Sequence, residues 1–238
     1  MSRQMIECKI TGVDVSIEKN KSQLLGPVSF ELANSNCTIV LGPNGAGKTS
    51  LLRLLHGLDK PTTGSITWDP LAKIEEQSFV FQSPVILKRN VIENVYYPLM
   101  LKGTSKKEAI TQAEYWLERI SLDHKAYAPA ISLSGGEKQR MVMARSLISD
   151  PKLIFLDEPT VNLDGKSKSK IEELLKHVIN NGTKIIMATH DLGQAKRLGN
   201  DILFLHHGKL LEVGSAASFF KNPKTKEGLT FLRGEILQ

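Results

Sequence analysis

The chain has 238 residues, of which 41% are hydrophobic and 24% charged, enough for one large domain or a domain with a subdomain. Its net charge of +6 suits an acidic partner or an anionic membrane surface, but the lysines are scattered, so we expect no nucleic-acid site. No apolar stretch has the length of a membrane span and no signal-peptide core follows Met1, which predicts a cytoplasmic protein.

The first part of the chain reads as strands around a loop. Apolar and polar residues alternate over Ile6–Ile17 and again over Val28–Leu32, which predicts an antiparallel sheet with one face in water. The apolar run Cys37–Leu41 predicts a buried strand, and Leu51–Leu55 has the periodicity of a buried helix. The cysteines, Cys8 and Cys37, both lie in such strand-like segments without metal-ligand spacing, so we expect two core thiols, no disulfide and no structural metal.

Further along, short strands are predicted at Ser65–Trp68 and Ser78–Phe81, followed by helices over Val91–Leu101 and Ser105–Ile120. A helical insertion thus begins after Gln82. Strands and helices then alternate, with strands at Leu153–Leu156, Lys184–Ala188 and Ile202–Leu205, and helices over Lys166–Asn180 and near Gln194. This alternation predicts a parallel sheet covered by helices on both faces, in a single α/β domain.

A phosphate-binding loop follows the predicted strand Cys37–Leu41. Its residues match the pattern G-x-x-x-x-G-K-[ST] and are Gly42, Pro43, Asn44, Gly45, Ala46, Gly47, Lys48, Thr49 and Ser50. The glycines let backbone N–H groups face the β-phosphate, Lys48 places a charge on the β and γ oxygens, and the Thr49 hydroxyl is a ligand for Mg²⁺. This loop predicts a nucleotide site, but it recurs in kinases, GTPases and motor ATPases alike.

Two carboxylates, Asp157 and Glu158, end the apolar run Leu153–Leu156. They are therefore expected at the carboxyl edge of a buried strand, where α/β sheets bind their ligands. Because side chains alternate along a strand, we expect the two acids to point differently, so that one holds Mg²⁺ and the other aligns the attacking water. The alternative, two acids at a solvated strand end, is disfavoured by the phosphate-binding loop.

A second helix start with exposed backbone N–H groups is predicted at Leu133–Arg140, with the sequence LSGGEKQR. The spacing from Ser134 to Glu137 is that of a capping box, and a well-capped helix is the simple interpretation. Gly135 and Gly136 are poor choices for that purpose alone, since each costs roughly 1 kcal/mol of helix stability relative to Ala. Bare N–H groups at a helix N-terminus are, however, suited to binding a phosphate.

LSGGEKQR resembles the signature of ATP-binding cassette (ABC) ATPases, and the motifs along the whole chain occur in the order of that family. The resemblance implies a P-loop NTPase fold of the ABC type, with a mixed sheet core, an antiparallel β subdomain and a helical subdomain. It implies one domain over residues 1–238, in which 1–82 and 150–238 form the core and the antiparallel subdomain and 83–149 form the helical subdomain.

The resemblance also implies a head-to-tail dimer of two copies of this chain, with ATP and Mg²⁺ as cofactors. The signature residues of one copy then close over the γ-phosphate that the loop of the other copy holds; these residues are Ser134, Gly135, Gly136 and Glu137.

Several roles follow from the resemblance residue by residue. Gln82 corresponds to a glutamine that senses Mg²⁺ and the permease, and Val161–Asp164 corresponds to the loop at the dimer axis. His190 corresponds to the switch histidine near the γ-phosphate, although a histidine after an apolar strand is more often a structural hydrogen-bonding residue. The implied catalytic residues are thus Glu158, His190 and Gln82, and the implied metal ligands are Thr49, Gln82 and Asp157.

One departure from the family concerns adenine. Members stack the base on an aromatic residue upstream of the phosphate-binding loop, and the stretch Ile17–Asn20 has none. We expect Ile17 or the stem of Lys19 to form a weaker apolar shelf. Glu158 is intact, which predicts an active ATPase.

Within the family, the chain resembles ATP-binding subunits of bacterial importers that work with a separate permease and a substrate-binding protein. The resemblance implies a peripheral position at the cytoplasmic face of the bacterial inner membrane, with a permease helix docked on Pro84–Leu87 and Val91–Tyr97. The phrases that are most similar to tungstate-type oxyanion importers are Phe81–Leu87, Tyr97–Leu99, Thr189–Ala195 and Phe231–Glu235. Phosphate and amino-acid importers, a lipoprotein or efflux system and a non-transport ABC ATPase are the alternatives.

Overall fold

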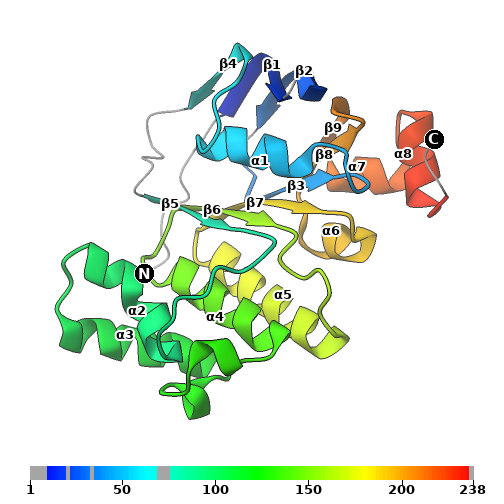
Figure 1. Ribbon diagram of the computed structural model, residues 1–238. Helices are drawn as coiled ribbons and strands as arrows, with labels where there is room; N and C mark the ends of the chain where they lie inside the picture. The colour runs from blue at the N-terminus through cyan, green and yellow to red at the C-terminus, as the bar shows by residue number, and fades with distance from the viewer. Residues whose placement is uncertain (1–9, 20–21, 33–34, 69–75, 236–238) are drawn as a thin grey trace.

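Two β-sheets and a set of helices make up the computed structural model of the chain, which describes residues 10–19, 22–32, 35–68 and 76–235 (Figure 1). The larger sheet has six strands in the order β5-β6-β7-β3-β8-β9. These strands are β3 (Cys37–Leu41), β5 (Gln77–Val80), β6 (Leu153–Asp157), β7 (Lys184–Thr189), β8 (Asp201–His206) and β9 (Lys209–Ser215). The first five in this order run parallel and β9 is antiparallel to β8, so the sheet is mixed.

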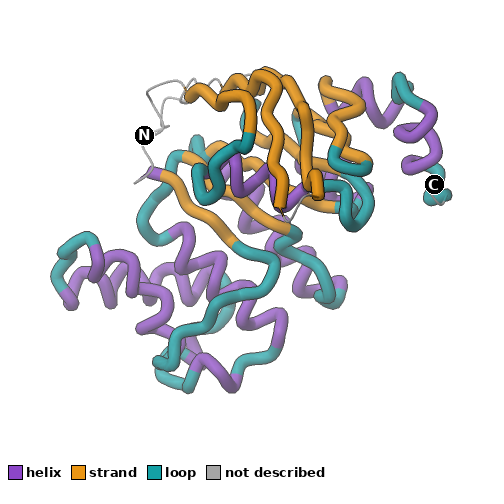
Figure 2. The backbone as a smooth tube through the Cα atoms, turned by 45° about the horizontal axis from the view of Figure 1, so that its top comes forward, coloured by secondary structure: helices purple, strands orange, loops and turns teal. Residues whose placement is uncertain are grey.

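The smaller sheet is antiparallel, in the order β2-β1-β4, and it covers one face of the larger one (Figure 2). Its strands are β1 (Ile10–Lys19), β2 (Ser22–Leu32) and β4 (Thr63–Trp68). Alternate residues of β1 and β2, such as Val15, Val28 and Phe30, are buried against helix α1 and the larger sheet. The predicted alternation is therefore confirmed where the chain is described; Ile6 and Cys8 lie outside the described residues.

Helix α1 (Lys48–His56) lies between the two sheets (Figure 1). Its buried residues Leu51, Leu52, Leu54 and Leu55 share one core cluster with the inner face of the antiparallel sheet and with β3, β6, β7 and β8. The helix ends at Gly57, whose left-handed conformation (φ 84°) allows its N–H to bond back to carbonyls of the last turn. This face of the larger sheet is thus covered by one helix and a sheet, and the other face by helices.

The helical half of the chain covers that other face. It consists of α2 (Val91–Leu101), α3 (Lys106–Arg119), α4 (Gly135–Leu147), α5 (Gly165–Asn180), α6 (Leu192–Leu198), α7 (Ala216–Lys221) and α8 (Lys226–Leu232). In Figure 1, α4 and α5 lie under the sheet and α2 and α3 lie farther from it. Cys37 is buried in this core, where burial raises the pKa of its thiol to about 12, so it packs as an unreactive apolar residue. None of the helices that the structure describes has the length and apolar character needed to cross a membrane.

Most predicted elements are confirmed within a residue or two, including the helical insertion after Gln82. The antiparallel strand β9 and helices α7 and α8 were not predicted. Helix α8 depends on a distant residue, because the buried carboxylate of Glu212 on β9 accepts hydrogen bonds from the backbone N–H groups of Lys224 and Thr225, at 2.9 and 2.8 Å.

Candidate functional site

The phosphate-binding loop joins β3 to α1 in a conformation that needs glycine. A Cβ on Gly42 would lie 2.2 Å from the carbonyl oxygen of Leu205, so no side chain fits there. Gly47, the residue before α1, has a left-handed φ of 98°, which glycine adopts without the strain that other residues meet. The backbone N–H groups at the start of α1 are therefore open toward the loop, as an anion-binding helix terminus requires.

Lys48 is held inside this loop although it carries a charge. Its side chain is nearly buried, and its ammonium donates hydrogen bonds to the carbonyl oxygens of Gly42 and Pro43, at 2.9 and 3.0 Å. The third partner of the ammonium is Glu158, whose Oε1 lies 3.1 Å from Nζ of Lys48. The cation is thus fixed in the centre of the loop, where it faces any phosphate bound by the surrounding N–H groups.

Asp157 and Thr49 meet where β6 ends beside the first turn of α1. The Thr49 hydroxyl lies 3.0 and 2.9 Å from the two carboxylate oxygens of Asp157. Burial raises the pKa of Asp157 above its ordinary value, and the nearby charge of Glu158 acts in the same direction, so a cation beside this carboxylate would offset an unfavourable charge. A hydroxyl and a carboxylate side by side are also hard oxygen ligands, and the pair therefore fits Mg²⁺.

Glu158 lies between Lys48 and His190. Its Oε2 is 2.9 Å from Nδ1 of His190, while its other oxygen faces Lys48. Glu158 has a left-handed φ of 47°, a conformation uncommon for residues other than glycine, and its N–H donates to the carbonyl of Ala188 on β7. The expectation that the two acids point differently is met, but the cause is this turn after the last residue of β6 and not the alternation of a strand.

A cavity of about 460 Å³ lies over these residues. Its wall contains Leu24, Gln82, Glu158, Val161 and His190 together with the loop residues 44–50. The structure thus brings together residues 44–50 of the predicted loop and three further predicted residues, Gln82, Glu158 and His190, although they come from separate strand ends.

The wall of this cavity also contains a residue that we did not predict. Leu24 of β2 is 39% exposed and lines the cavity, whereas Ile17, which we expected to support the adenine, packs against the core. The side chain of Lys19 lies outside what the structure describes. Leu24 has the parity of the buried residues Val28 and Phe30, and the register shift between Val28 and Leu25 turns it outward, so strand alternation did not predict it.

The signature residues lie elsewhere. Helix α4 begins at Gly135, and its start is a capping box, with Ser134 Oγ accepting from the N–H of Glu137 and Glu137 Oε2 accepting from the N–H of Ser134. Lys125, 2.5 Å from the carboxylate, and the bonds from Ser134 lower the pKa of Glu137 to about 2. Within the described chain, none of the four signature residues lines the cavity over the loop.

The signature helix nevertheless presents an open N-terminus. Ser134 and Gly135 are exposed, and no atom lies within 4 Å of the position that a Cβ on Gly135 would take. Gly136 is closer to its surroundings, because a Cβ there would lie 2.6 Å from the hydroxyl of Ser167 on α5. The arrangement can therefore accept a ligand over Gly135 from outside the nucleotide cavity of the same chain.

A buried asparagine of α2, Asn94, is another residue that we did not predict. Its side chain accepts from the N–H of Leu87 (2.9 Å) and donates to the carbonyls of Leu87 and Asn90 (3.1 and 3.0 Å). These bonds hold the segment that leads away from Gln82. The signal was a polar residue three positions after Val91 and next to Val95, on the apolar face of the helix.

Comparison with known proteins gives a consistent result. The family model described as "ABC transporter" matches residues 25–161. The chain is 33% identical to the arginine transport ATP-binding protein ArtM of Bacillus subtilis, over 89% of this chain and 93% of that protein. It is 34% identical to the phosphate import ATP-binding protein PstB 1 of Streptococcus agalactiae (94% and 96%) and 35% identical to the tungstate uptake system ATP-binding protein TupC of Peptoclostridium acidaminophilum (84% and 94%).

Solved structures agree with this. The dimeric, ADP- and phosphate-bound structure of the ATP-binding cassette MJ0796 superposes with a TM-score of 0.75, at 28% sequence identity, and covers 87% of this chain and 98% of that one. With the geometry of the loop, Asp157 and Glu158, these likenesses lead to one conclusion. The chain belongs to the ABC transporter family and is its ATP-binding domain, an ATPase whose hydrolysis of ATP is coupled to transport.

Proposed function

We propose that this chain is the ATP-hydrolysing subunit of a bacterial importer, that it works as a head-to-tail pair, and that it energises uptake of an oxyanion, tungstate, through a separate permease. One observation carries the proposal. The cavity over the phosphate-binding loop has its base and its cation in contact, Glu158 with Lys48, while the open helix start at Ser134 lies outside that cavity. Each chain thus supplies one part of a shared site.

In this proposal the roles of the site residues follow from their contacts. Lys48 and the N–H groups of the loop bind the β- and γ-phosphates. Thr49 and Asp157, joined at 2.9–3.0 Å, hold Mg²⁺ together with Gln82, and the ion neutralises charge on the phosphate oxygens when it is bound. Glu158 accepts a proton from the attacking water. His190 contacts the Glu158 carboxylate at 2.9 Å and orients this carboxylate near the γ-phosphate.

The second copy supplies the signature. Ser134, Gly135, Gly136 and Glu137 of the partner approach the γ-phosphate with the N–H groups of α4, and the space over Gly135 leaves room for that phosphate. Because these contacts exist only with ATP bound, loss of the γ-phosphate removes the differential affinity that holds the pair closed. The dimeric form of the MJ0796 cassette supports this arrangement.

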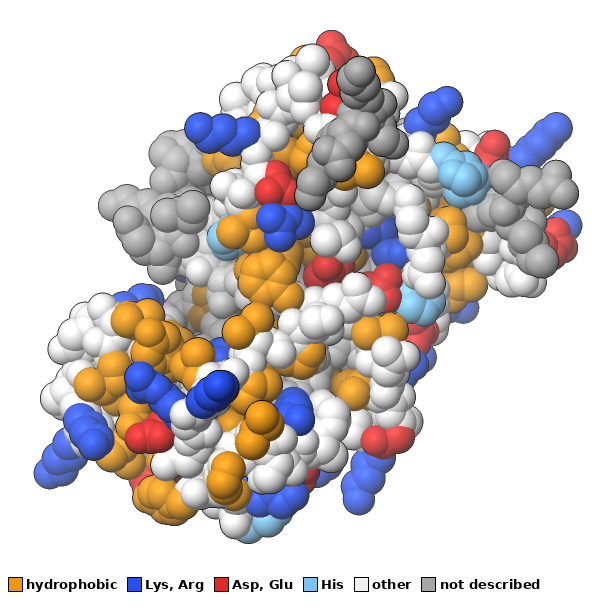
Figure 3. All heavy atoms as spheres, viewed as in Figure 1, with side chains coloured by type: hydrophobic (Ala, Val, Ile, Leu, Met, Phe, Trp, Pro, Cys, Tyr) orange, Lys and Arg blue, Asp and Glu red, His pale blue; other side chains and the backbone are white. Residues whose placement is uncertain are grey.

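We also propose the division of the domain that the sequence implied. Residues 1–82 and 150–238 form the core with its antiparallel subdomain, and residues 83–149 form the helical signature subdomain that carries the permease. Figure 3 shows hydrophobic side chains interspersed with lysine and arginine over the lower half of the molecule, where Figure 1 places these helices.

The docking face for the permease is narrower than the sequence suggested. In the segment Pro84–Leu87, Val85 is 59% exposed and available to a partner, whereas Val91, Ile92, Val95 and Tyr96 are buried in the core. A contact with the permease is therefore expected at the segment after Gln82. Through this contact the chain is held at the cytoplasmic face of the membrane.

Tungstate is the cargo we favour because of the likeness to TupC, in addition to the phrases named above. A substrate-binding protein delivers it to the permease in this proposal. Phosphate and amino acids are the alternatives, since PstB 1 and ArtM are similar to the chain to nearly the same degree.

The experiment is to tag the chain, extract it gently from its native membranes and identify the proteins that accompany it. We expect a multi-span permease and a binding protein, and the latter is then titrated calorimetrically with tungstate, molybdate, phosphate and arginine. Preferential binding of tungstate supports the proposal, and preference for phosphate or arginine replaces the cargo but keeps the importer. Recovery of ribosomal proteins alone contradicts transport.

A further inference from the structure

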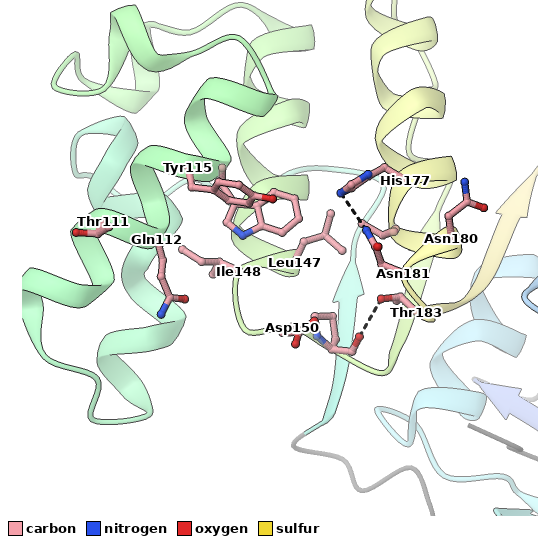
Figure 4. A pocket seen from close by; sticks show the side chains of 13 residues that line it. Thr111, Gln112, Tyr115, Leu147, Ile148, Asp150, His177, Asn180, Asn181 and Thr183 are labelled. Atoms are coloured by element: carbon pink, nitrogen blue, oxygen red, sulfur yellow. Dashed lines mark hydrogen bonds between the residues drawn. The ribbon is translucent and has the colours of Figure 1, made fainter. Parts of the chain in front are cut away.

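A second pocket lies away from the nucleotide cavity, between α3 and the C-terminal ends of α4 and α5 (Figure 4). Its volume is about 580 Å³, larger than that of the cavity over the phosphate-binding loop and within the range of roughly 300–1,000 Å³ usual for small-molecule sites. No residue of the catalytic or signature sets lines it. The function proposed above therefore leaves this pocket unexplained.

One side of the pocket is aromatic and apolar. Tyr115 and Trp116 of α3 form an edge-to-face pair with their ring centres 6.0 Å apart, and Tyr115 is half exposed. Leu147 and Ile148, at the end of α4, lie beside them as Figure 4 shows. Exposed aromatic faces next to aliphatic side chains bind flat aromatic rings well, because ring pairs gain about 0.5–1.5 kcal/mol beyond the area they bury.

The opposite side is polar but almost without charge. Asn181 and Thr183 stand at the end of α5 and after it, and His177 faces α3 across the pocket (Figure 4). Burial and the positive charge of Arg119 lower the pKa of His177, so its ring is neutral at pH 7. Arg119 donates to Nε2 of His177 at 3.0 Å and also lies over the ring of Tyr115, so its charge is already engaged.

The charge balance excludes several ligand classes. Among the described residues, the pocket wall contains no lysine or arginine, and its one charged residue is the carboxylate of Asp150. Arg119 contacts His177 and Tyr115 of the wall but does not line the pocket, so a phosphate or carboxylate ligand would find no cation in the wall itself. Asn181 Nδ2 donates to Nε2 of His177 at 3.0 Å and the Thr183 hydroxyl donates to the carbonyl of Pro151 at 3.2 Å. The groups of the wall that can match a neutral polar molecule are therefore the amide oxygen of Asn181 and the amides of Gln112 and Asn180.

We propose that this pocket binds a small, uncharged, planar aromatic molecule that carries an amide-like group. The ring lies against Tyr115 and Trp116, and the polar group faces the side chains at the end of α5. Such a ligand would contact both α3 and α5, the two helices that the Arg119–His177 hydrogen bond already connects. It would also touch the C-terminal end of α4. The signature lies at the other end of that helix, about 20 Å away for 13 residues.

Nicotinamide is a suitable probe, since it has both a flat ring and an amide. The chain has two tryptophans, so replacing Trp68 by Phe leaves Trp116 as the one indole N–H signal in a nitrogen–proton correlation spectrum. We expect nicotinamide to shift this signal saturably, with a Kd on the order of 1 mM, as befits a ligand of so few atoms. Nicotinate, its anionic counterpart, and cyclohexanecarboxamide, which has no aromatic ring, should shift it at least about tenfold more weakly.

Three variants test the location. Tyr115→Ala should abolish the saturable shift, whereas Tyr127→Ala, which removes a 74% exposed tyrosine outside the pocket, should leave it unchanged. Gln112→Phe, at a partly exposed position in the pocket wall, should reduce the shift by filling the space.

The shift should persist with ATP present, which separates this pocket from the nucleotide cavity. Equal shifts with the three probes, an undiminished shift in Tyr115→Ala, or no saturable shift would each overturn the proposal. The readout is binding, so it is independent of whether the chain energises an importer.

Discussion

Glu158→Gln is the substitution that tests the proposed chemistry most directly. Glutamine has the size of glutamate, so the side chain can stay in the same position, where Glu158 lies 3.1 Å from Lys48 and 2.9 Å from His190. An amide, however, cannot take a proton from water. A positioned general base contributes roughly 10²–10⁴-fold to a rate, which is about 2.7–5.4 kcal/mol at 1.36 kcal/mol for each factor of ten. We therefore expect kcat to fall by two to four orders of magnitude.

Binding of ATP should respond in the opposite sense. The ammonium of Lys48 keeps its bonds to the carbonyls of Gly42 and Pro43, but it loses the carboxylate that competes with phosphate for it. The variant should thus bind ATP as tightly as the parent or more tightly. With Mg²⁺ and ATP it should accumulate as a dimer, because the closed state no longer loses its γ-phosphate.

The assays are phosphate release at saturating ATP, equilibrium binding of ATP, and size-exclusion chromatography with light scattering. Glu172→Gln is the matched control, since it removes another nearly buried glutamate that is paired with an arginine, Arg197, outside the nucleotide cavity. A fall in kcat of less than about threefold for Glu158→Gln would refute the role of this residue as the base. A mutant that stays monomeric with ATP and Mg²⁺ would count against the shared site.

Four further predictions concern the cap, the cation, the signature carboxylate and the buried asparagine. Ser134→Ala should abolish turnover while ATP binding by the monomer is unchanged, and should lower helix stability by about 1 kcal/mol; unchanged phosphate release would exclude a shared site. Lys48→Met should weaken ATP binding at least about tenfold in a fluorescence titration, and unchanged affinity would contradict its phosphate contact. The pKa of Glu137 is lowered from 4.5 to about 2, so its ionised form stabilises the fold above pH 4.5 and this contribution is lost as the pH falls toward 2. In urea titrations, the difference in unfolding free energy between the parent and Glu137→Gln should decrease over that pH range. A difference that is independent of pH would refute the ion pair. Asn94→Ala should cost about 1–3 kcal/mol in the same assay, because partly buried backbone groups of Leu87 lose their partner, and a cost below about 0.5 kcal/mol would contradict that account.

Much of the fold could be predicted because its signals are local. Asn90 begins α2 with a capping box, and the periodic apolar residues of that helix carry it to its predicted end. The strand, loop and helix around Lys48 also follow from adjacent residues. Strand β9 and helix α8 could not be predicted in this way, since β9 is largely exposed and the start of α8 depends on the carboxylate of Glu212.

In the site, too, the features with local signals could be predicted and those that depend on tertiary contacts could not. The loop, the two carboxylates and the signature could be named from their motifs, but their contacts depend on how strand ends meet in the parallel sheet. Glu158 reaches both Lys48 and His190 because β3, β6 and β7 are neighbours, and because its left-handed backbone turns it away from the strand. Leu24, and not the expected Ile17, lines the cavity, and this too depends on which face of the antiparallel sheet is packed.

The position of α1 between two sheets limits which parts of the molecule can move. Both sides of this helix are packed, so the amide hydrogens beyond its first turn should exchange with solvent only when the whole domain unfolds. The phosphate-binding loop is anchored to this helix and to β3, and it therefore serves as a fixed reference during the ATP cycle. Displacement on binding and release of nucleotide must then occur in the peripheral segments, and hydrogen exchange should be slowest at α1 and fastest in the loops around residues 83–90.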